Sequence, residues 1–341
     1  MTGIVTLTAS AAIDQTYLLT DLVVGSVNRA VGANQEISGK GVNVARAVQL
    51  SGQPVSAVLA IGELDAALVE RSGFADTLRA VIVPGHTRRN TTITDKNGRT
   101  TKVNELAIPI SGEHWNALRE TALAEVDRLD ADWLVLCGSL PSLVETGELV
   151  PVLELIDQAA ATGTRIAIDT SGAALDLIAD HLEHVALLKP NTHELSELVG
   201  RDLLTVGHVI EAAQELRRRG VEVVFASMGE DGSLGVAEEG VWWARVAAPR
   251  VVNSVGAGDA ALAGFLVNAI DPAADDQRTL DVPRALTAAA SWGALAVSQA
   301  TTLLCDIESA PIADLIVSPD SEYMLLDPAR VTREKLERQV R

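Results

Sequence analysis

Residues 251–264 place two glycines and an aspartate between two apolar stretches, an order suited to handling an anion. An apolar stretch leads into Gly256-Ala257-Gly258-Asp259, and apolar residues at helical spacing follow. This order puts unpaired backbone N–H groups at a helix N-terminus, where they can hold an anion. The two glycines let the chain turn tightly and let an anion approach the backbone. Asp259 would repel an anion, so we interpret it as a base that takes a proton from a hydroxyl attacking the held group.

Two other interpretations of this segment stay open. One is an ordinary glycine turn with Asp259 as the helix N-cap, a position that favours aspartate. The other is a dinucleotide-binding loop, because Gly256-x-Gly258-x-x-Ala261 fits the loose glycine pattern of such loops. The late position of the segment and the carboxylate where a pyrophosphate would lie argue against the second interpretation.

Four further loops carry polar groups that could serve the same chemistry. Ser38–Arg46 is a glycine loop entering a helix, in which Lys40 could meet an anion and Asn43 a hydroxyl; its plainer interpretation is a helix start with a solvated lysine. Cys137–Pro141, with Ser139, follows a buried strand, and ligands bind at the carboxyl ends of strands in open α/β sheets.

The remaining two loops also follow predicted strands. In Lys189–Glu194, Asn191 and Glu194 have the spacing of a capping box, and the functional alternative is that they position metal-bound water and phosphate. His193 reads as a surface residue. Ser227–Gly232 is either a plain hairpin turn or a nucleotide phosphate contact. Together the loops and the helix start describe a phosphoryl-transfer site, which needs a phosphate cradle, Mg²⁺ and a base.

Several other catalytic classes lack their motifs. The sequence contains no P-loop, since Gly39-Lys40 is followed by glycine, and no H-E-x-x-H, paired-cysteine zinc spacing or G-x-S-x-G. The net charge of −19 argues against a nucleic-acid partner and against an anionic membrane surface. Two cysteines imply no disulfide framework. The N-terminus resembles no signal peptide and no apolar run is long enough to span a bilayer, so we expect a cytoplasmic protein.

The elements that must position these loops alternate along the chain. Hydrophobic patterning predicts strands at 4–7, 56–61, 133–136, 165–168, 185–188 and 221–226, and helices at 41–52, 147–162, 173–181, 192–199, 206–219, 258–270 and 282–299. This rhythm predicts an α/β fold with a mostly parallel sheet covered by helices on both faces. Residues 233–246 predict a hairpin, residues 271–282 an acidic loop and Val331–Arg341 a charged helix.

Two segments depart from this rhythm. Residues 11–38 and 87–109 are polar and strand-like, and Asp95-Lys-Asn-Gly98 is a strong hairpin turn. We expect them to pair into a small sheet beside a core made of 1–10, 39–86 and 110–315, and to act as a lid that excludes water. Residues 316–341 form a C-terminal extension to which the sequence assigns no role. A homodimer through the lid would cover its edges and faces.

The motifs resemble those of the ribokinase-like (PfkB-type) carbohydrate kinases. Ser38–Arg46 resembles their N-terminal signature, G-G-K-G-x-N-x-A, and Val252–Gly264 resembles their C-terminal signature around G-A-G-D; the similarity extends over roughly residues 1–305. It implies a three-layer αβα core with a small β lid, ATP and Mg²⁺. Within the family, Asn253–Asp259, Thr87–Asn90 and Val103–Glu105 resemble the branch of 1-phosphofructokinase and tagatose-6-phosphate kinase.

The resemblance implies roles residue by residue. At the sugar, Asp14 and Asn43 would hold hydroxyls, Gly39 would give a backbone contact and Ser139 would line the wall. Gly256, Ala257 and Gly258 would form the anion hole, with Asp259 as the base. At ATP, the residues would be Lys189, Asn191, Glu194, Ser227, Gly229 and Gly232, with Glu194 facing Mg²⁺ through water. A sugar phosphate also needs cations, for which the lid region supplies Arg29, Arg88 and Lys102, with Lys40 nearby. In an acidic chain that placement is informative, although they could be scattered surface charges.

The leading hypothesis is an ATP- and Mg²⁺-dependent kinase of a ketohexose monophosphate, with fructose 1-phosphate converted to fructose 1,6-bisphosphate. Three departures from the family pattern leave the sugar open: Ser10-Ala-Ala replaces Asn-Pro-Ala, Ser38 replaces the first signature glycine, and Ala261 is small. The alternatives are a tagatose-6-phosphate kinase, a kinase of an unphosphorylated sugar or nucleoside, a non-catalytic sugar-phosphate-binding regulator and an NAD-dependent oxidoreductase.

Overall fold

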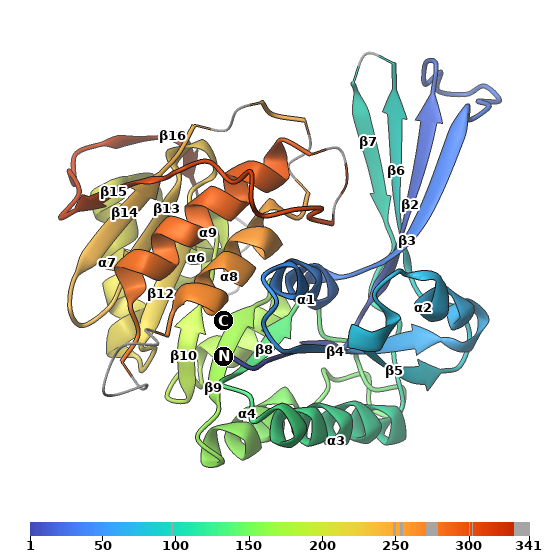
Figure 1. Cartoon of the computed structure of the whole chain (residues 1–341), viewed down its shortest axis with the longest axis horizontal. Coiled ribbons are helices and arrows are strands. Elements are labelled where there is room, and N and C mark those ends of the chain that lie inside the picture. Colours follow the sequence, from blue (N-terminus) through green and yellow to red (C-terminus); the bar gives the residue numbers. More distant parts are fainter. Residues whose placement is uncertain are drawn as a thin grey trace.

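The structure is a computed structural model that describes residues 1–96, 98–247, 250–252, 255–270, 279–299, 301 and 303–330. Within these residues the core is a single large sheet between two layers of helices, and a separate small sheet projects from it (Figure 1). The predicted α/β class with a mostly parallel central sheet and a small second sheet is confirmed. No helix in these ranges is long and apolar enough to cross a membrane.

The central sheet has the strand order β15-β14-β13-β12-β10-β9-β8-β1-β4-β5. Neighbours from β12 through β5 pair in parallel, whereas β13, β14 and β15 pair antiparallel at one edge. The strand bounds are β1 Ile4–Thr8, β4 Val55–Gly62, β5 Leu78–Val83, β8 Trp133–Cys137, β9 Arg165–Asp169, β10 Val185–Leu188, β12 Val223–Ser227, β13 Ser233–Val236, β14 Val241–Arg245 and β15 Asp314–Val317.

Helices cover both faces of this sheet because successive strand side chains point to opposite sides. On β8, Trp133 and Val135 face the layer of α1 (Lys40–Leu50), α8 (Ala257–Asn268) and α9 (Val282–Val297). The alternate residues Leu134 and Leu136 face the other layer. That layer comprises α3 Gly112–Leu129, α4 Val152–Ala161, α5 Ala173–Ala179, α6 Thr192–Val199 and α7 Val206–Arg218. The short helices α2 (Ala67–Arg71), η1 (Glu63–Asp65), η2 (Ala75–Thr77) and η3 (Gly229–Asp231) lie in connections.

The small sheet joins two distant segments of the chain, as expected. Its strands are β2 Ala12–Leu19, β3 Gly32–Ser38, β6 Arg89–Asp95 and β7 Thr100–Asn104, in the order β3-β2-β6-β7. β2 and β6 pair in parallel with Asp14 opposite Asn90. The predicted hairpin at 91–103 is confirmed, although Asn97 in its turn lies outside the described residues. The small sheet projects away from the central sheet and its helices (Figure 1).

Most predicted elements are found within a few residues, and the differences have local causes. The helix predicted at 147–162 begins only at Val152, because Leu149 bridges back to Ser142 and Pro151 precedes the helix. Helix α3 was not predicted, although Trp115, Leu118 and Ala122 have helical spacing and are buried. The loop at 271–278 and the helix at 331–341 lie outside the described residues.

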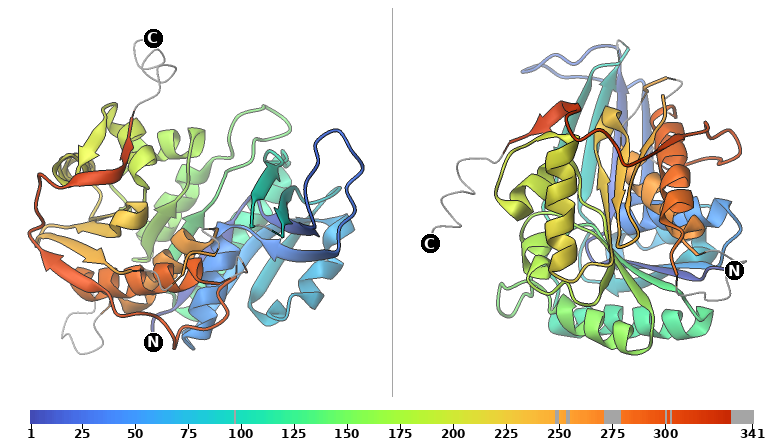
Figure 2. Two further views of the ribbon diagram at one scale, coloured as in Figure 1. Left: turned by 90° about the horizontal axis from the view of Figure 1, so that it is seen from above. Right: turned by 90° about the vertical axis from the view of Figure 1, so that its left-hand side faces the viewer.

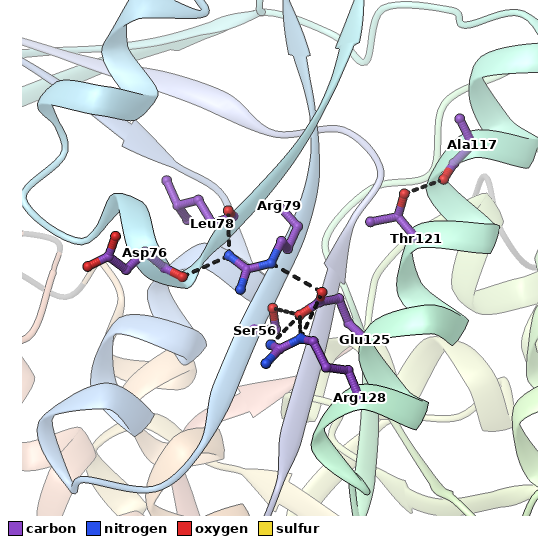
Figure 3. A network of polar contacts seen from close by, with 8 residues as sticks. All are labelled: Ser56, Asp76, Leu78, Arg79, Ala117, Thr121, Glu125 and Arg128. Carbon is purple, nitrogen blue, oxygen red and sulfur yellow. Dashed lines mark hydrogen bonds and ion pairs between the residues drawn. The ribbon is translucent and has the colours of Figure 1, made fainter.

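A buried carboxylate ties α3 to the amino ends of β4 and β5 (Figure 3). Glu125 accepts a hydrogen bond from the Ser56 hydroxyl at 2.5 Å and two from the Arg128 guanidinium to its Oε2, at 3.0 and 2.5 Å. Arg79 Nε lies 3.2 Å from Glu125 Oε1. The Arg128 hydrogen bond lowers the pKa of Glu125 to about 2, against burial and with the help of Ser56 and Arg79. We call these four residues the Glu125 cluster.

Candidate active site

A cavity of about 400 Å³ opens between the small sheet and the carboxyl ends of the central strands. Most of the predicted site residues line it: Asp14, Gly39, Lys40, Asn43, Arg88, Lys102, Ser139, Lys189, Asn191, Glu194, Ser227, Gly256, Gly258 and Asp259. The carboxyl ends of parallel strands meet at one edge of the sheet, so residues far apart in sequence come together there.

Asp259 lies in the first turn of α8 and is 7% exposed. The N-cap of α8 is Gly256, whose φ of 81° lies in the left-handed region that favours glycine, and no side chain caps this helix. The interpretation of Asp259 as an N-cap is therefore wrong. Its Oδ2 instead accepts a 2.7 Å hydrogen bond from Asn43 Nδ2, across the packed helices α1 and α8.

The environment of Asp259 makes it a stronger base than an ordinary aspartate. Burial and then the negative charge of Asp169 raise the pKa of Asp259 to about 6, against the Asn43 hydrogen bond and the charges of Lys40 and Lys189. A carboxyl whose pKa lies near the working pH is ionised at neutral pH yet able to accept a proton. This is the perturbation expected of a general base.

Asp169 is a site residue that sequence reasoning missed. It ends β9 and is fully buried, with Lys40 Nζ 2.6 Å from Oδ1 and Lys189 Nζ 2.9 Å from Oδ2. Burial acts to raise the pKa of Asp169, but Lys189 and Lys40 outweigh it and the pKa lies below its usual range. Its position at the end of a predicted strand was the available signal. We call Asp169, Lys40, Lys189 and Asp259 the Asp259 cluster.

Two lysine side chains lie beside the start of α8. Burial acts to lower the pKa of Lys40, but Asp169, and then Asp259 and Glu194, raise it above its ordinary value. Lys189 Nζ would lie only 3.4 Å from a Cβ placed on Gly258. An anion bound at the N-terminus of α8 would therefore meet both backbone N–H groups and an ammonium group.

The capping box predicted at Asn191 and Glu194 is confirmed. Asn191 Oδ1 accepts from the Glu194 backbone N–H, and Glu194 Oε2 accepts from the Asn191 N–H, both at 2.9 Å. Both residues also line the cavity, so the structural role does not exclude a second one. His193 is exposed, as expected of a surface residue.

The small sheet turns a polar face to the cavity. Alternate residues of three strands line it: Asp14 and Thr16 on β2, Asn90 and Thr92 on β6, and Lys102 and Asn104 on β7.

Arg88, just before β6, donates to the backbone carbonyls of Ser10, Ala11 and Glu105. Burial lowers the pKa of Arg88, against the charges of Asp14 and Glu105. Arg88 is thereby held in place as a cation at the edge of the cavity.

Four predicted residues are not among those that line this cavity: Arg29, Ala257, Gly229 and Gly232. Arg29 is exposed in the loop between β2 and β3. Ala257 is the first residue of α8, between two glycines that do line the cavity. Gly229 and Gly232 belong to the turn after Ser227. Their assigned roles stay predictions.

Known proteins with similar sequences are carbohydrate kinases. The family of pfkB carbohydrate kinases matches residues 5–309. The 1-phosphofructokinase of Haemophilus influenzae is 33% identical over 312 residues, which cover 90% of this chain and 95% of that protein. The 1-phosphofructokinase of Haloferax volcanii is 35% identical and covers 77% of this chain and 83% of its own length.

The fold agrees as well. The crystal structure of phosphofructokinase-2 from Escherichia coli in complex with fructose-6-phosphate superposes with a TM-score of 0.76 at 26% identity, covering 90% of this chain and 96% of that one. The family match spans both glycine loops of the cavity, Ser38–Arg46 and Gly256–Asp259. The chain thus belongs to the pfkB family of carbohydrate kinases, and it is an ATP-dependent sugar kinase.

Proposed function

We propose that this enzyme transfers the γ-phosphoryl group of ATP to the free primary hydroxyl of a ketohexose monophosphate, and that its substrate is fructose 1-phosphate. The product would be fructose 1,6-bisphosphate. The observation that carries the proposal is Asp259, a buried carboxylate in the first turn of a helix whose N-terminus no side chain caps, with its pKa raised to about 6.

Asp259 would act as the base. Its carboxylate takes the proton of the 6-hydroxyl as that oxygen attacks the γ-phosphorus, and the bond from phosphorus to the β-phosphate oxygen breaks to release ADP. The Asn43 amide orients the carboxylate by donating to Oδ2. The other carboxylate oxygen is left to face the substrate.

The backbone of Gly256, Ala257 and Gly258 would hold the transferring group, since these residues open α8 and bear its first N–H groups. Lys189 beside Gly258 adds a positive charge where negative charge develops. Asp169 fixes both Lys189 and Lys40 in the cavity wall.

The donor set fits a magnesium ion that arrives with ATP. The described residues hold no cluster of three or more side chains able to ligate a metal. Mg²⁺ is commonly held by substrate phosphates, water and only one or two carboxylates. Glu194 in the cavity wall is the carboxylate that would reach it through water. When bound, Mg²⁺ would neutralise phosphate charge.

The sugar phosphate would lie under the small sheet. Its polar face offers Asp14 for hydroxyls, and Arg88 and Lys102 offer positive charge for the phosphate. Closure of this sheet over the sugar would exclude water from the transferring group. The names of the curated relatives, 1-phosphofructokinase, favour phosphate at carbon 1.

Assembly through the same sheet is part of the proposal. Its outer face carries partly exposed apolar side chains, Tyr17 at 37% and Val103 at 59% exposure. A tetrameric form is named for phosphofructokinase-2 from Escherichia coli. We expect a dimer in sedimentation experiments, and a V103E substitution should shift it towards monomer; a monomeric unaltered protein would contradict this.

The function is tested by measuring ADP release with ATP and Mg²⁺ against fructose 1-phosphate, fructose 6-phosphate, tagatose 6-phosphate, fructose, ribose and adenosine. We expect a clear preference for fructose 1-phosphate. In the Arg88→Ala variant, KM for the sugar phosphate should rise by about 10-fold or more, as expected for loss of a charge-assisted contact. Turnover with a neutral sugar that is unaffected by this substitution would overturn the substrate assignment.

A further inference from the structure

The C-terminal residues 318–330 follow β15; their first part meets the start of α7, and their last part lies against α6 and η3 (Figure 2). We call this segment the strap. Its strand β16 (Met324–Ala329) pairs with the short strand β11 (Leu203–Thr205). The family match ends at residue 309, so the strap lies outside the part of the chain that the match covers.

The strap is firmly seated on the core. The first two N–H groups of α7, on Val206 and Gly207, donate to the carbonyls of Tyr323 and Ser321, both at 2.9 Å. A Cβ on Gly207 would lie 2.8 Å from the Ser321 oxygen, so only glycine allows this approach. Leu325 and Ala329 are buried in the core beneath it.

The strap also binds the turn that follows β12. Asp231, in η3, is 1% exposed, and both oxygens of its carboxylate bind the strap. Oδ1 accepts from the Tyr323 hydroxyl at 3.1 Å and Oδ2 accepts from the Leu326 backbone N–H at 2.8 Å. The carbonyl of Asp231 accepts from Trp243 Nε1 at 2.6 Å. A buried carboxylate held in this way fixes the backbone of its turn.

An aromatic and cationic stack supports the Tyr323 hydroxyl. The Tyr323 ring packs edge-on against Trp243, with 4.9 Å between ring centroids. The Arg245 guanidinium lies over both rings, and its Nη2 donates to the Tyr323 hydroxyl at 3.3 Å. The Tyr323 hydroxyl therefore bridges the Arg245 guanidinium and the buried Asp231 carboxylate, and the ring contacts leave it little freedom to move.

The turn that Asp231 belongs to, Ser227–Gly232, begins at the wall of the cavity. Its first residue, Ser227, lines the cavity, and the Ser227 N–H donates to the carbonyl of Pro190 in the neighbouring loop. The strap touches that loop's helix too, since Asp327 Oδ2 lies 3.6 Å from His193 Nε2. One segment thus contacts both loops to which the proposed function assigns ATP.

We infer that the strap positions the nucleotide-binding turn Ser227–Gly232 through Asp231, so that Tyr323 and Asp231 set the affinity for ATP without touching it. This inference rests on the proposed function, because it needs ATP beside Ser227. Both are positioning residues. Their loss should weaken ATP binding and leave the sugar site, which is built on the small sheet and α1, unchanged.

The test is an ATP titration at saturating sugar phosphate, and a sugar-phosphate titration at saturating ATP, on three variants. Asp231→Asn puts an amide N–H₂ or a weaker acceptor at the Tyr323 hydroxyl and Leu326 N–H. Tyr323→Phe removes one hydroxyl and keeps the ring stack. Met324→Ala, whose side chain is 60% exposed, is the matched control on the strap.

We expect KM for ATP to rise about tenfold in Asp231→Asn and about threefold in Tyr323→Phe, the size expected for hydrogen bonds to a buried carboxylate. KM for the sugar phosphate should stay within about twofold, and the control should be unchanged. Hydrogen exchange of residues 228–234 should be faster in both variants, because η3 has lost its anchor.

Two results would overturn the inference: an unchanged KM for ATP in both variants, or equal changes in both KM values and in kcat, which would indicate a general structural role. If Asp231→Asn fails to fold, Tyr323→Phe decides alone, since its loss is one hydroxyl. If the unaltered chain neither binds ATP nor releases ADP, the proposed function fails first and the inference falls with it.

Discussion

Two buried clusters of charge lie on opposite edges of the central sheet, one at the amino ends of β4 and β5 and the other at the carboxyl ends of β9 and β10, and they are built alike. In the Glu125 cluster, at the amino ends of β4 and β5, one carboxylate is held by Arg79 and Arg128. In the Asp259 cluster, at the carboxyl ends, the carboxylate of Asp169 is held by Lys40 and Lys189. Each therefore pairs one buried carboxylate with two cations.

The clusters differ in whether a second carboxylate lies beside the first. Around Glu125 the surrounding donors lower its pKa to about 2, so the cluster holds a fixed charge and fastens α3 to the sheet. Beside Asp169 lies a second carboxylate, Asp259, whose pKa is raised to about 6. The Glu125 cluster has one carboxylate matched by two cations, and it stabilises the fold. The Asp259 cluster has a second carboxylate, and that one can accept a proton. Four experiments can break or sharpen this contrast.

The largest effect should come from Asp259→Asn. Loss of the base should lower kcat by roughly 10²–10⁴-fold. Stability should hold or rise, because the repulsion between Asp169 and Asp259 is gone. Steady-state kinetics and chemical unfolding measure both quantities. Near-full turnover in this variant would contradict the assignment of the base.

Asp169→Asn should affect both stability and rate. It leaves Lys40 and Lys189 without their buried partner, which costs about 3–5 kcal/mol for a broken buried ion pair. It also removes the negative charge that, after burial, raises the pKa of Asp259, so the acidic limb of kcat/KM should move to lower pH. A pH profile identical to that of the unaltered enzyme would show that Asp169 does not act on Asp259.

Glu125→Gln is the matched change in the other cluster. Its arginines are part-exposed and can turn to water, so the free energy of unfolding should fall by only about 1–3 kcal/mol. Because the cluster lies at the amino edge of the sheet and the cavity at the carboxyl edge, kcat and both KM values should stay within about twofold. A tenfold loss of kcat would mean that the two ends of the sheet are coupled.

The smallest effect is a difference in how stability depends on pH. The pKa of Asp259 is higher folded than its unfolded value near 3.9, so its stabilisation is present below pH 4 and lost as pH rises through 6, at no more than about 1.4 kcal/mol per pH unit. The pKa of Glu125 is lower folded, so its stabilisation is present above about pH 4.5 and lost as pH falls towards 2.

Unfolding of the two variants across pH 3–7 separates these contributions. Asp259→Asn should remove the decline between pH 4 and 6, and Glu125→Gln should remove part of the loss at acidic pH. Catalytic rate should rise with pH through about 6, as Asp259 becomes ionised. A flat rate from pH 5 to 7 would contradict the raised pKa.

The sequence allowed much of this site to be predicted because strand ends and helix starts are local features. The glycines before Asp259, the loop at Lys40 and the capping box at Asn191 could each be read from a few neighbouring residues. Their meeting in one cavity followed from the rule that parallel strands end at the same edge. Membership of a kinase family also removes the dinucleotide-loop interpretation of Gly256–Ala261.

What the sequence missed depended on partners far along the chain. Asp169 looks like any polar residue after a strand, and only the arrival of Lys40 and Lys189 makes it part of the site. Arg29 was grouped with Arg88 by charge, yet Arg29 is exposed in a loop whereas Arg88 is held by three carbonyls at the cavity. The role inferred for the strap has the same origin, since Tyr323 and Asp231 are 92 residues apart.

By itself the sequence determined the types of element, their order and the family, because hydrophobic periodicity, glycine positions and capping residues act over a few residues. Only the tertiary structure decided which carboxylate is fixed and which is poised. Asp259 and Glu125 are both buried acids, and their pKa values move in opposite directions. Burial acts to raise both pKa values, and the partners that folding places around each acid decide the sign. At Glu125, Arg128 on the same helix, together with Ser56 and Arg79 from the sheet, outweighs burial, whereas at Asp259 the negative charge of Asp169 from β9 adds to it.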